Sequence, residues 1–209
     1  MNPEIIAISG SPIPNSNTER MLKRILESSG LKGELVKLSH LNVRPCFHCK
    51  KCVYDNICKI NDDFPALAEK IKTAKALIIG AYTPYAQVDA FTKALLERFW
   101  SFRHLKNLLK GKLGAVVVTS IHPSMAESSL KAIACELRDY ENMEIIGEVA
   151  VQGNIPCVSC GPGDECVQSG LRKFQGGAKA ADFPYARAED QPAWAEAERI
   201  GRVIADRLS

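Results

Sequence analysis

Short apolar runs alternate with stretches of helical apolar spacing along this chain. Five runs have the length and the continuous apolar character of buried strands, and they occupy residues 4–9, 34–38, 76–80, 113–119 and 145–151. A helical stripe lies between each run and the next, and another closes the chain. Because strands that alternate with helices pair in parallel through right-handed crossovers, the pattern predicts an open parallel sheet with helices on both faces.

The predicted helices have recognisable ends and inward faces. Gly30 is typical of a helix C-terminus, and Asp62 and Asp63 can cap the start of another helix. In the third helix, the spacing predicts that Phe91 faces inward and that Arg98 is solvated. The other residues expected on inward faces are Met21, Leu22, Ile25, Leu26, Phe64, Leu67, Ala68, Ile71, Ala94, Leu95, Phe99, Leu130, Ile133, Ala134, Cys135, Leu137, Trp194, Ala197, Ile204 and Leu208.

Composition narrows the class of protein. The 209 residues, 46% of them apolar, predict one domain over 1–209, with a cysteine-rich loop at 42–61 and a C-terminal extension at 153–209. A net charge of +3 with interleaved signs argues against nucleic acid. We expect no membrane partner and a cytoplasmic location, because neither a run of roughly 18 apolar residues nor a secretory signal is visible. In that compartment, eight cysteines favour ligands over disulfides.

The loop after the first predicted strand, residues 9–18, is rich in hydroxyl and amide side chains. It leads into a helix, and the N–H groups at a helix start favour an anion such as phosphate. The loop has neither a GxGxxG nor a GxxxxGKS pattern, which argues against a dinucleotide fold or an NTPase. Two interpretations stay open, a phosphate site or a helix cap in which Asn17 or Thr18 satisfies free N–H groups.

The loop after the third predicted strand has two aromatic side chains, Tyr82 and Tyr85. Ligands of such sheets bind at the carboxyl ends of the strands, where the strand order reverses. A flat cofactor would gain stacking on an aromatic ring there. The alternative is that Tyr85 is a partly buried packing residue.

The strongest chemical signal is a compact group of four cysteines, separated by two, two and five residues. Such spacing lets neighbouring sulfurs converge on one inorganic centre and favours an iron–sulfur cluster. Zinc sites usually combine two more widely separated pairs, but zinc, disulfides or inert thiols stay open. His48 lies inside the group and is expected to be a surface imidazole. The candidate ligands are Cys46, Cys49, Cys52 and Cys58.

A second group of cysteines repeats the spacing of the last three members of the first. It consists of Cys157, Cys160 and Cys166, and Asn154 stands where a fourth ligand would be. Three thiolates could bind a second cluster with an outside ligand, or a zinc ion, or act as a redox-active or spare group. We treat this group as a possible second metal site.

Together these motifs resemble the NADPH-dependent FMN reductase-like proteins of flavodoxin fold, and within them the iron–sulfur flavoproteins. The family's first loop, GSPRxxGNT, is similar to residues 10–18, with Ile13 in place of the Arg. The family's compact cysteine motif and Asp-Asp helix start resemble residues 46–63, and its aromatic loop resembles residues 83–85. The resemblance extends from the first to the fifth predicted strand.

The resemblance implies a flavodoxin-like, doubly wound, five-stranded parallel sheet of order 2-1-3-4-5. It also implies FMN at the strand ends, with its phosphate on the first loop and its ring near Pro84 and Tyr85. A homodimer or homotetramer is expected as well. The candidate cofactor-binding residues are Ser9, Ser11, Ser16, Asn17, Thr18, Thr83, Pro84, Tyr85 and Ser120.

The function that the resemblance implies is that of an FMN-dependent oxidoreductase, linked to NAD(P)H or ferredoxin. FMN would exchange two electrons, and a 4Fe–4S cluster would pass them singly. One alternative is an NAD(P)H-dependent FMN or quinone reductase with structural cysteines, and another is a non-catalytic electron carrier or redox sensor. The expected partner is a small molecule or ferredoxin. No side chain is identified as a general acid or base.

Overall fold

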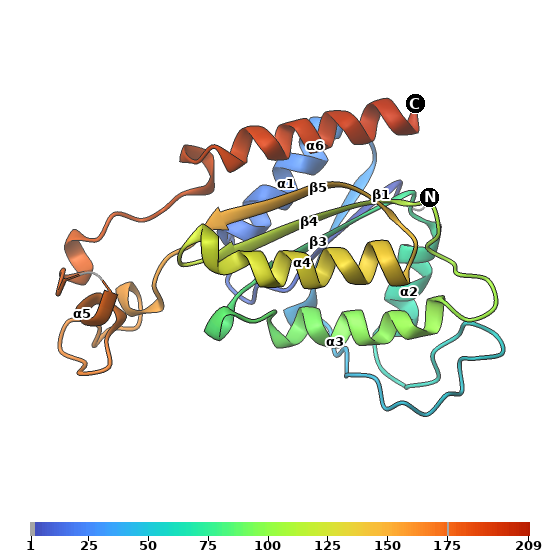
Figure 1. The fold of residues 1–209 in the computed structure, drawn as a ribbon, viewed down its shortest axis with the longest axis horizontal. Coiled ribbons are helices and arrows are strands. Elements are labelled where there is room, and N and C mark those ends of the chain that lie inside the picture. Colours follow the sequence, from blue (N-terminus) through green and yellow to red (C-terminus); the bar gives the residue numbers. More distant parts are fainter. Residues whose placement is uncertain (1–2, 175) are drawn as a thin grey trace.

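The computed structural model describes residues 3–174 and 176–209 and contains a five-stranded, all-parallel sheet (Figure 1). Its strand order is β2-β1-β3-β4-β5, which confirms the flavodoxin-like sheet that the sequence predicts. All five expected strands are present. Their bounds are β1 Ile5–Ser9, β2 Gly33–Lys37, β3 Ala76–Tyr82, β4 Leu113–Ser120 and β5 Glu144–Gln152.

The strand order reverses between β1 and β3, which lie side by side at the centre of the sheet. Their register pairs Ser9 with Gly80, so the two strands end at nearly the same level. The loops that follow them therefore diverge from neighbouring points to opposite faces of the sheet. This is the position where doubly wound sheets leave room for a ligand.

Helices cover both faces of the sheet. In chain order they are α1 (Asn17–Ser29), α2 (Phe64–Thr73), α3 (Ala90–Arg98), α4 (Glu127–Cys135), the short α5 (Gly170–Phe174) and α6 (Ala193–Leu208). On one face, α1 and α6 pack against the strands and against each other, and α2, α3 and α4 cover the other face.

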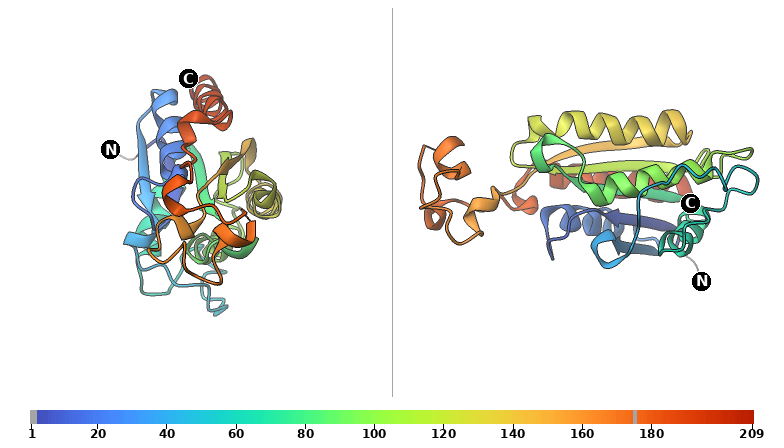
Figure 2. Two further views of the ribbon diagram at one scale, coloured as in Figure 1. Left: turned by 90° about the vertical axis from the view of Figure 1, so that its left-hand side faces the viewer. Right: turned by 90° about the horizontal axis from the view of Figure 1, so that it is seen from below.

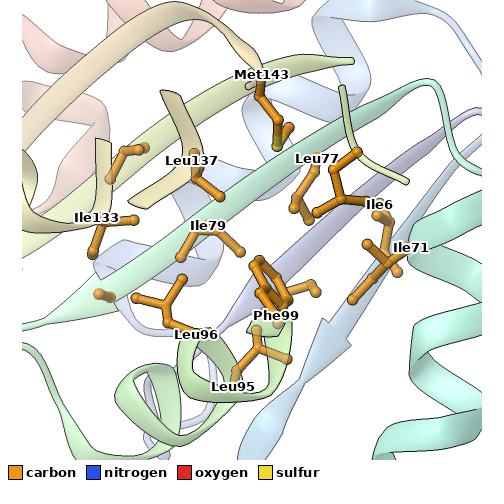
Figure 3. Close-up of a cluster of buried hydrophobic side chains, with 14 of the residues drawn as sticks. Ile6, Ile71, Leu77, Ile79, Leu95, Leu96, Phe99, Ile133, Leu137 and Met143 are labelled. Atoms are coloured by element: carbon orange, nitrogen blue, oxygen red, sulfur yellow. The ribbon is translucent and has the colours of Figure 1, made fainter. Parts of the chain in front are cut away.

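The alternation of side chains along β1 explains the two cores. Ile6 and Ile8 point to the face of α2, α3 and α4, and Ile5 and Ala7 point to the face of α1 and α6. All four side chains are fully buried. Figure 3 shows the first of these cores, where strand residues such as Ile79 meet helix residues from α2, α3 and α4. A strand covered on both faces needs apolar residues at every position, which is why these runs read as continuous.

Four expectations from the sequence are wrong in detail. Phe91 is exposed, and Arg98 is buried rather than solvated. Leu95 and Phe99 point inward as expected, but the rotation of α3 buries Thr92 and Arg98 beside them and leaves Phe91 outside. Cys135 is half-buried near the end of α4, so it is not a core residue. The second strand ends at Lys37, because Leu38 already begins a tight helical turn.

Two long irregular segments lie outside this layered core. One joins β2 to α2 and contains the first cysteine group, and the other runs from β5 to α6 and contains the second. The second segment projects with α5 beyond the carboxyl ends of the strands, as Figures 1 and 2 show. Within residues 3–174 and 176–209, no helix has both the length and the apolar character needed to cross a membrane.

Candidate functional site

A cavity of about 960 Å³ opens at the carboxyl ends of the strands. Its volume lies in the range of pockets that hold cofactor-sized ligands. The first loop, the loop after β3, the end of β4 and the returning C-terminal segment form its walls. All the predicted cofactor-binding residues except Ser9 line it, namely Ser11, Ser16, Asn17, Thr18, Thr83, Pro84, Tyr85 and Ser120.

The first loop is shaped by its own hydroxyl groups. The buried Ser9 hydroxyl accepts a hydrogen bond from the backbone N–H of Ser11 at 3.3 Å, so Ser9 supports the loop from beneath. The Ser16 hydroxyl caps α1 by accepting from the N–H of Glu19 at 3.3 Å. A helix cap is thus present, but it is Ser16 rather than Asn17 or Thr18. Because the capped helix begins at the cavity wall, the cap and the phosphate site are compatible interpretations.

Asn17 and Thr18 have side chains that are already partnered. The Asn17 amide donates to the carbonyl oxygens of Gln152 at 2.9 Å and Ala186 at 2.7 Å, and its oxygen accepts from the N–H of Ala188 at 3.2 Å. The Thr18 hydroxyl lies 2.8 Å from the hydroxyl of Thr119. Asn17 therefore offers its backbone rather than its side chain to a ligand.

The loop after β3 is strained and open. Tyr85 and Ala86 have backbone φ angles of 53° and 58°, which residues other than glycine rarely adopt. The Tyr85 ring is 99% exposed, so it is not a partly buried packing residue. The Thr83 hydroxyl donates to the Ser120 hydroxyl at 2.7 Å and thereby joins the ends of β3 and β4. Tyr85 is free to cover a flat ligand in the cavity.

Sequence reasoning missed one wall of the cavity. Tyr185, Ala186 and Arg187 line it, although they lie far from the first loop in the sequence. Residues 153–156, 158 and 159 also contribute. Among them, the Asn154 side chain exchanges two hydrogen bonds with the backbone of Ala186 at 2.8 and 3.2 Å. Asn154 is thus a structural residue and not a free ligand. These residues have no apolar period or motif, so no sequence signal pointed to them.

The first cysteine group lies against the C-terminal end of α3. The backbone N–H of Cys46 donates to the Glu97 carboxylate at 3.3 Å, and the side chain of Asn56 donates to the Ser101 carbonyl at 3.0 Å. The cavity, in contrast, is bordered by the loop that leads into the start of α3. His48 is exposed, as the sequence predicts, and its ring lies 5.8 Å from that of Trp100.

The buried side chain of Arg98 attaches the first cysteine loop to α3. Its guanidinium donates to both carboxylate oxygens of Asp62, at 2.5 and 3.1 Å, and to the Cys58 sulfur at 3.2 and 3.3 Å. Burial by itself would raise the pKa of Asp62, but donors from Arg98 and from two backbone N–H groups hold it below its usual range. The pKa of Arg98 is correspondingly raised despite burial, because Asp62 and Cys58 favour its charged form. Asp62, the first residue of the Asp-Asp pair, thus joins the loop to α3.

The four thiols of the first group are free and electrostatically coupled. Burial raises the pKa of the Cys52 thiol, and the charges of Cys58, Cys46 and Cys49 raise it further. Cys49 is exposed, whereas Cys46 and Cys58 are half-buried. Among the residues that the structure describes, no three Cys, His, Asp or Glu side chains stand in position to hold a metal ion. The loop therefore brings the donors near one another without closing a site.

The second cysteine group also stays open. The Cys157 sulfur accepts a hydrogen bond from the N–H of Gly170 at 3.2 Å, and this bond lowers the pKa of its thiol. Cys160 is exposed, and its sulfur donates to the Cys157 carbonyl at 3.5 Å. Pro156, Val158 and Ser159 line the cavity, but within the described part of the chain the sulfurs of this group do not. The group therefore lies beside the cavity without lining it.

The sequence matches a known family. The profile of the NADPH-dependent FMN reductase family matches residues 3–152. An iron–sulfur flavoprotein of Methanocaldococcus jannaschii is 29% identical over 133 residues, which are 62% of this chain and 69% of that protein. An iron–sulfur flavoprotein of Methanosarcina thermophila is 32% identical over 117 residues, which are 54% of this chain and 61% of that one.

The fold also matches solved structures. The NAD(P)H:quinone oxidoreductase from Methanothermobacter marburgensis superposes with a TM-score of 0.58 at 17% identity, over 98% of this chain and 96% of that one. This likeness shows the fold. The family match ends at the close of β5 and leaves the second cysteine group outside it. Because that match nonetheless spans most of the sequence, the chain belongs to the NADPH-dependent FMN reductase family, as an FMN-dependent oxidoreductase.

Proposed function

We propose that this protein binds FMN in the cavity at the strand ends and a 4Fe–4S cluster on its first cysteine group. In this proposal it transfers electrons between a donor, ferredoxin or NAD(P)H, and an acceptor. The observation that best supports FMN binding is the cavity of about 960 Å³. The start of α1 and the exposed Tyr85 both line it. The family match supports the same cofactor.

The residues of the cavity fit FMN in two parts. The hydroxyls of Ser11 and Ser16 and the N–H groups that begin α1 suit a phosphate. Pro84, Tyr85 and Ile155 offer apolar surface for a flat ring system. When bound there, FMN would supply two-electron redox chemistry, and the protein would position it and exclude water.

The first cysteine group fits a cluster by its donors. Four free thiols on one loop form the ligand set that a cubane cluster needs, and the relatives that match this chain are named iron–sulfur flavoproteins. A bound cluster would supply one-electron transfer. Arg98, which already donates to the Cys58 sulfur, would stabilise negative charge on that ligand.

The open arrangement of the thiols favours one alternative. If the cysteines are structural, the protein is an NAD(P)H-dependent FMN or quinone reductase that needs FMN alone.

The measurement that separates the two functions is the content of iron, sulfide, zinc and flavin in protein purified without oxygen. We expect four iron and four sulfide per chain together with FMN. Flavin with zinc, or flavin without metal, would contradict the cluster and leave the reductase.

A single substitution tests the ligand assignment. We expect Cys49→Ser to lose most of the iron and sulfide while it retains FMN, because the exposed Cys49 loop lies apart from the cavity. Cys135→Ser, at the end of α4, is the matched control and should retain both. Iron assay and flavin absorbance on the two proteins make the comparison. Loss of FMN from Cys49→Ser would mean that the loop supports the fold rather than a cluster.

A further inference from the structure

A segment beyond the family match closes one wall of the cavity. After β5 the chain projects outward with α5 and then returns to the start of α6 (Figures 1 and 2). On its return it passes the start of α1, where Tyr185, Ala186 and Arg187 line the cavity. These three residues lie outside the family match, which covers residues 3–152.

Hydrogen bonds hold the backbone on both sides of Arg187. On the side of Ala186, the side chains of Asn17 and Asn154 donate to its carbonyl at 2.7 and 3.2 Å, and Asn154 accepts from its N–H at 2.8 Å. On the other side, the N–H of Ala188 donates to Asn17 at 3.2 Å. Arg187 is therefore fixed next to the first residue of α1.

Further contacts fasten the same turn to the sheet. The Gln191 side chain donates to the carbonyl of Arg187 at 3.0 Å and exchanges two hydrogen bonds with the backbone of Gln152 at 2.8 and 3.0 Å. The Ala188 side chain is fully buried in the core between α1 and α6. The position of the turn is thus set by packing and by hydrogen bonds from three directions.

The Arg187 side chain, in contrast to its backbone, is available. It is 61% exposed, and its guanidinium lies 3.9 Å from the Glu189 carboxylate. Arg20 also lines the cavity, but its side chain is only 26% exposed and one of its guanidinium nitrogens pairs with the Glu189 carboxylate at 3.1 Å. The first loop itself, residues 9–18, contains no lysine or arginine, and Ile13 is an exposed apolar side chain. Of the two arginines that line the cavity, Arg187 is therefore the more exposed and the more weakly paired.

We propose that Arg187 binds the phosphate of FMN and that residues 185–188 form a clasp which delivers this charge from outside the family match. The inference rests on the proposed binding of FMN in this cavity. Guanidinium groups suit phosphate because they donate two parallel, charge-assisted hydrogen bonds. The clasp fixes the backbone of Arg187 beside the first residue of α1, and Arg187 lines the same cavity as Ser11 and Ser16. A phosphate bound there would accept from the guanidinium as well as from the N–H groups that begin α1.

The test compares FMN with riboflavin, which has the same ring and no phosphate. Flavin-free protein is titrated with each ligand, and binding is followed by flavin fluorescence. We expect Arg187→Gln to weaken FMN binding roughly 10- to 100-fold, as for the loss of a charged hydrogen bond, and to leave riboflavin affinity within about twofold. Arg187→Lys should lie between, because it keeps the charge without the paired donors.

Arg202→Gln is the control for Arg187→Gln. Arg202 is an exposed arginine of α6 that lies 3.6 Å from Glu198, and its substitution should change the affinity for neither flavin. Salt should weaken FMN binding to the unmodified protein more than to Arg187→Gln. Equal losses for both flavins, or an unchanged FMN affinity, would overturn the role of Arg187 while FMN binding stands. If the unmodified protein binds neither flavin, the proposed function fails together with this inference.

Discussion

Arg98 shows how one buried ion pair joins a functional loop to the scaffold. Its guanidinium and the Asp62 carboxylate are both fully buried, and they share two hydrogen bonds. The guanidinium also lies 4.5 Å from the centre of the ring of Phe64, which is the first residue of α2. A pair enclosed in this way is costly to break from one side, because the remaining charge has no water to solvate it.

We therefore expect Arg98→Met to lower the free energy of unfolding by about 3–5 kcal/mol, because Asp62 stays charged and buried. Arg44→Met is the matched control, since Arg44 lies 3.9 Å from the same carboxylate but is 43% exposed, and it should cost less than about 1 kcal/mol. Urea unfolding of the two variants makes the comparison. Adding Asp62→Asn to Arg98→Met should restore part of the loss, and equal effects of Arg98→Met and Arg44→Met would contradict this account.

At the scale of elements, α1 and the C-terminal clasp depend on each other through Asn17. This residue opens α1, and its side chain makes three hydrogen bonds to the backbone of residues 152, 186 and 188. The cavity wall is therefore assembled from two ends of the chain. A change at the start of α1 should be felt at the clasp, although the two are separated by most of the sequence.

Asn17→Ala tests this coupling. We expect the amide hydrogens of residues 185–188 to exchange at least about tenfold faster, because their carbonyl and N–H groups lose a shared partner. The free energy of unfolding should fall by about 1–3 kcal/mol. Lys23→Ala, on the exposed side of the same helix, serves as the control. Hydrogen exchange read by mass spectrometry would show unchanged rates at 185–188 if the clasp were held by packing alone.

For the whole molecule, the two proposed redox sites contact opposite ends of α3. The cavity borders the loop before this helix, and the cysteine loop is held by Glu97, Arg98 and Ser101 at its far end. A helix of nine residues is about 14 Å long. The homodimer or homotetramer that the resemblance implies stays a prediction, in which a second copy would bring a cysteine loop nearer to a cavity.

We expect the buried carboxyl of Glu141 to make the stability of the whole fold depend on pH. The residue is fully buried, and burial raises its pKa to about 7, although Arg103, 2.9 Å away, opposes the shift. Between the unfolded value near 4.5 and about 7, the folded protein keeps a proton that the unfolded chain releases. Stability should therefore fall as pH rises through this window, by about 3 kcal/mol from this group.

The measurement is the free energy of unfolding between pH 4.5 and 8. We expect Glu141→Gln to flatten the decline, because the amide cannot ionise. Glu148→Gln, an exposed position on β5, should keep the slope of the unmodified protein. A slope that is the same in all three proteins would assign the pH dependence to other groups.

The pattern of apolar residues was sufficient for the strands, most helices and the parallel sheet. Strands buried on both faces, such as residues 76–82, cannot tolerate polar positions, so their local composition reflects the fold directly. The hydroxyl-rich first loop and the loop at Tyr85 were likewise visible, because loops at the strand ends of such a sheet meet at one place. Residues of one loop that could bind a ligand are close together in the sequence, so their spacing can be recognised without the structure.

Contacts between distant parts of the chain were invisible in the sequence. The burial of Arg98 depends on Asp62 and Cys58 from another segment, and a single charged residue on a helix gives no sign of such partners. The clasp at Arg187 has no apolar period, because hydrogen bonds from Asn17 and Asn154 position it. Periodicity records which side of an element is buried, whereas specific polar pairing becomes defined only when the folded elements meet in space.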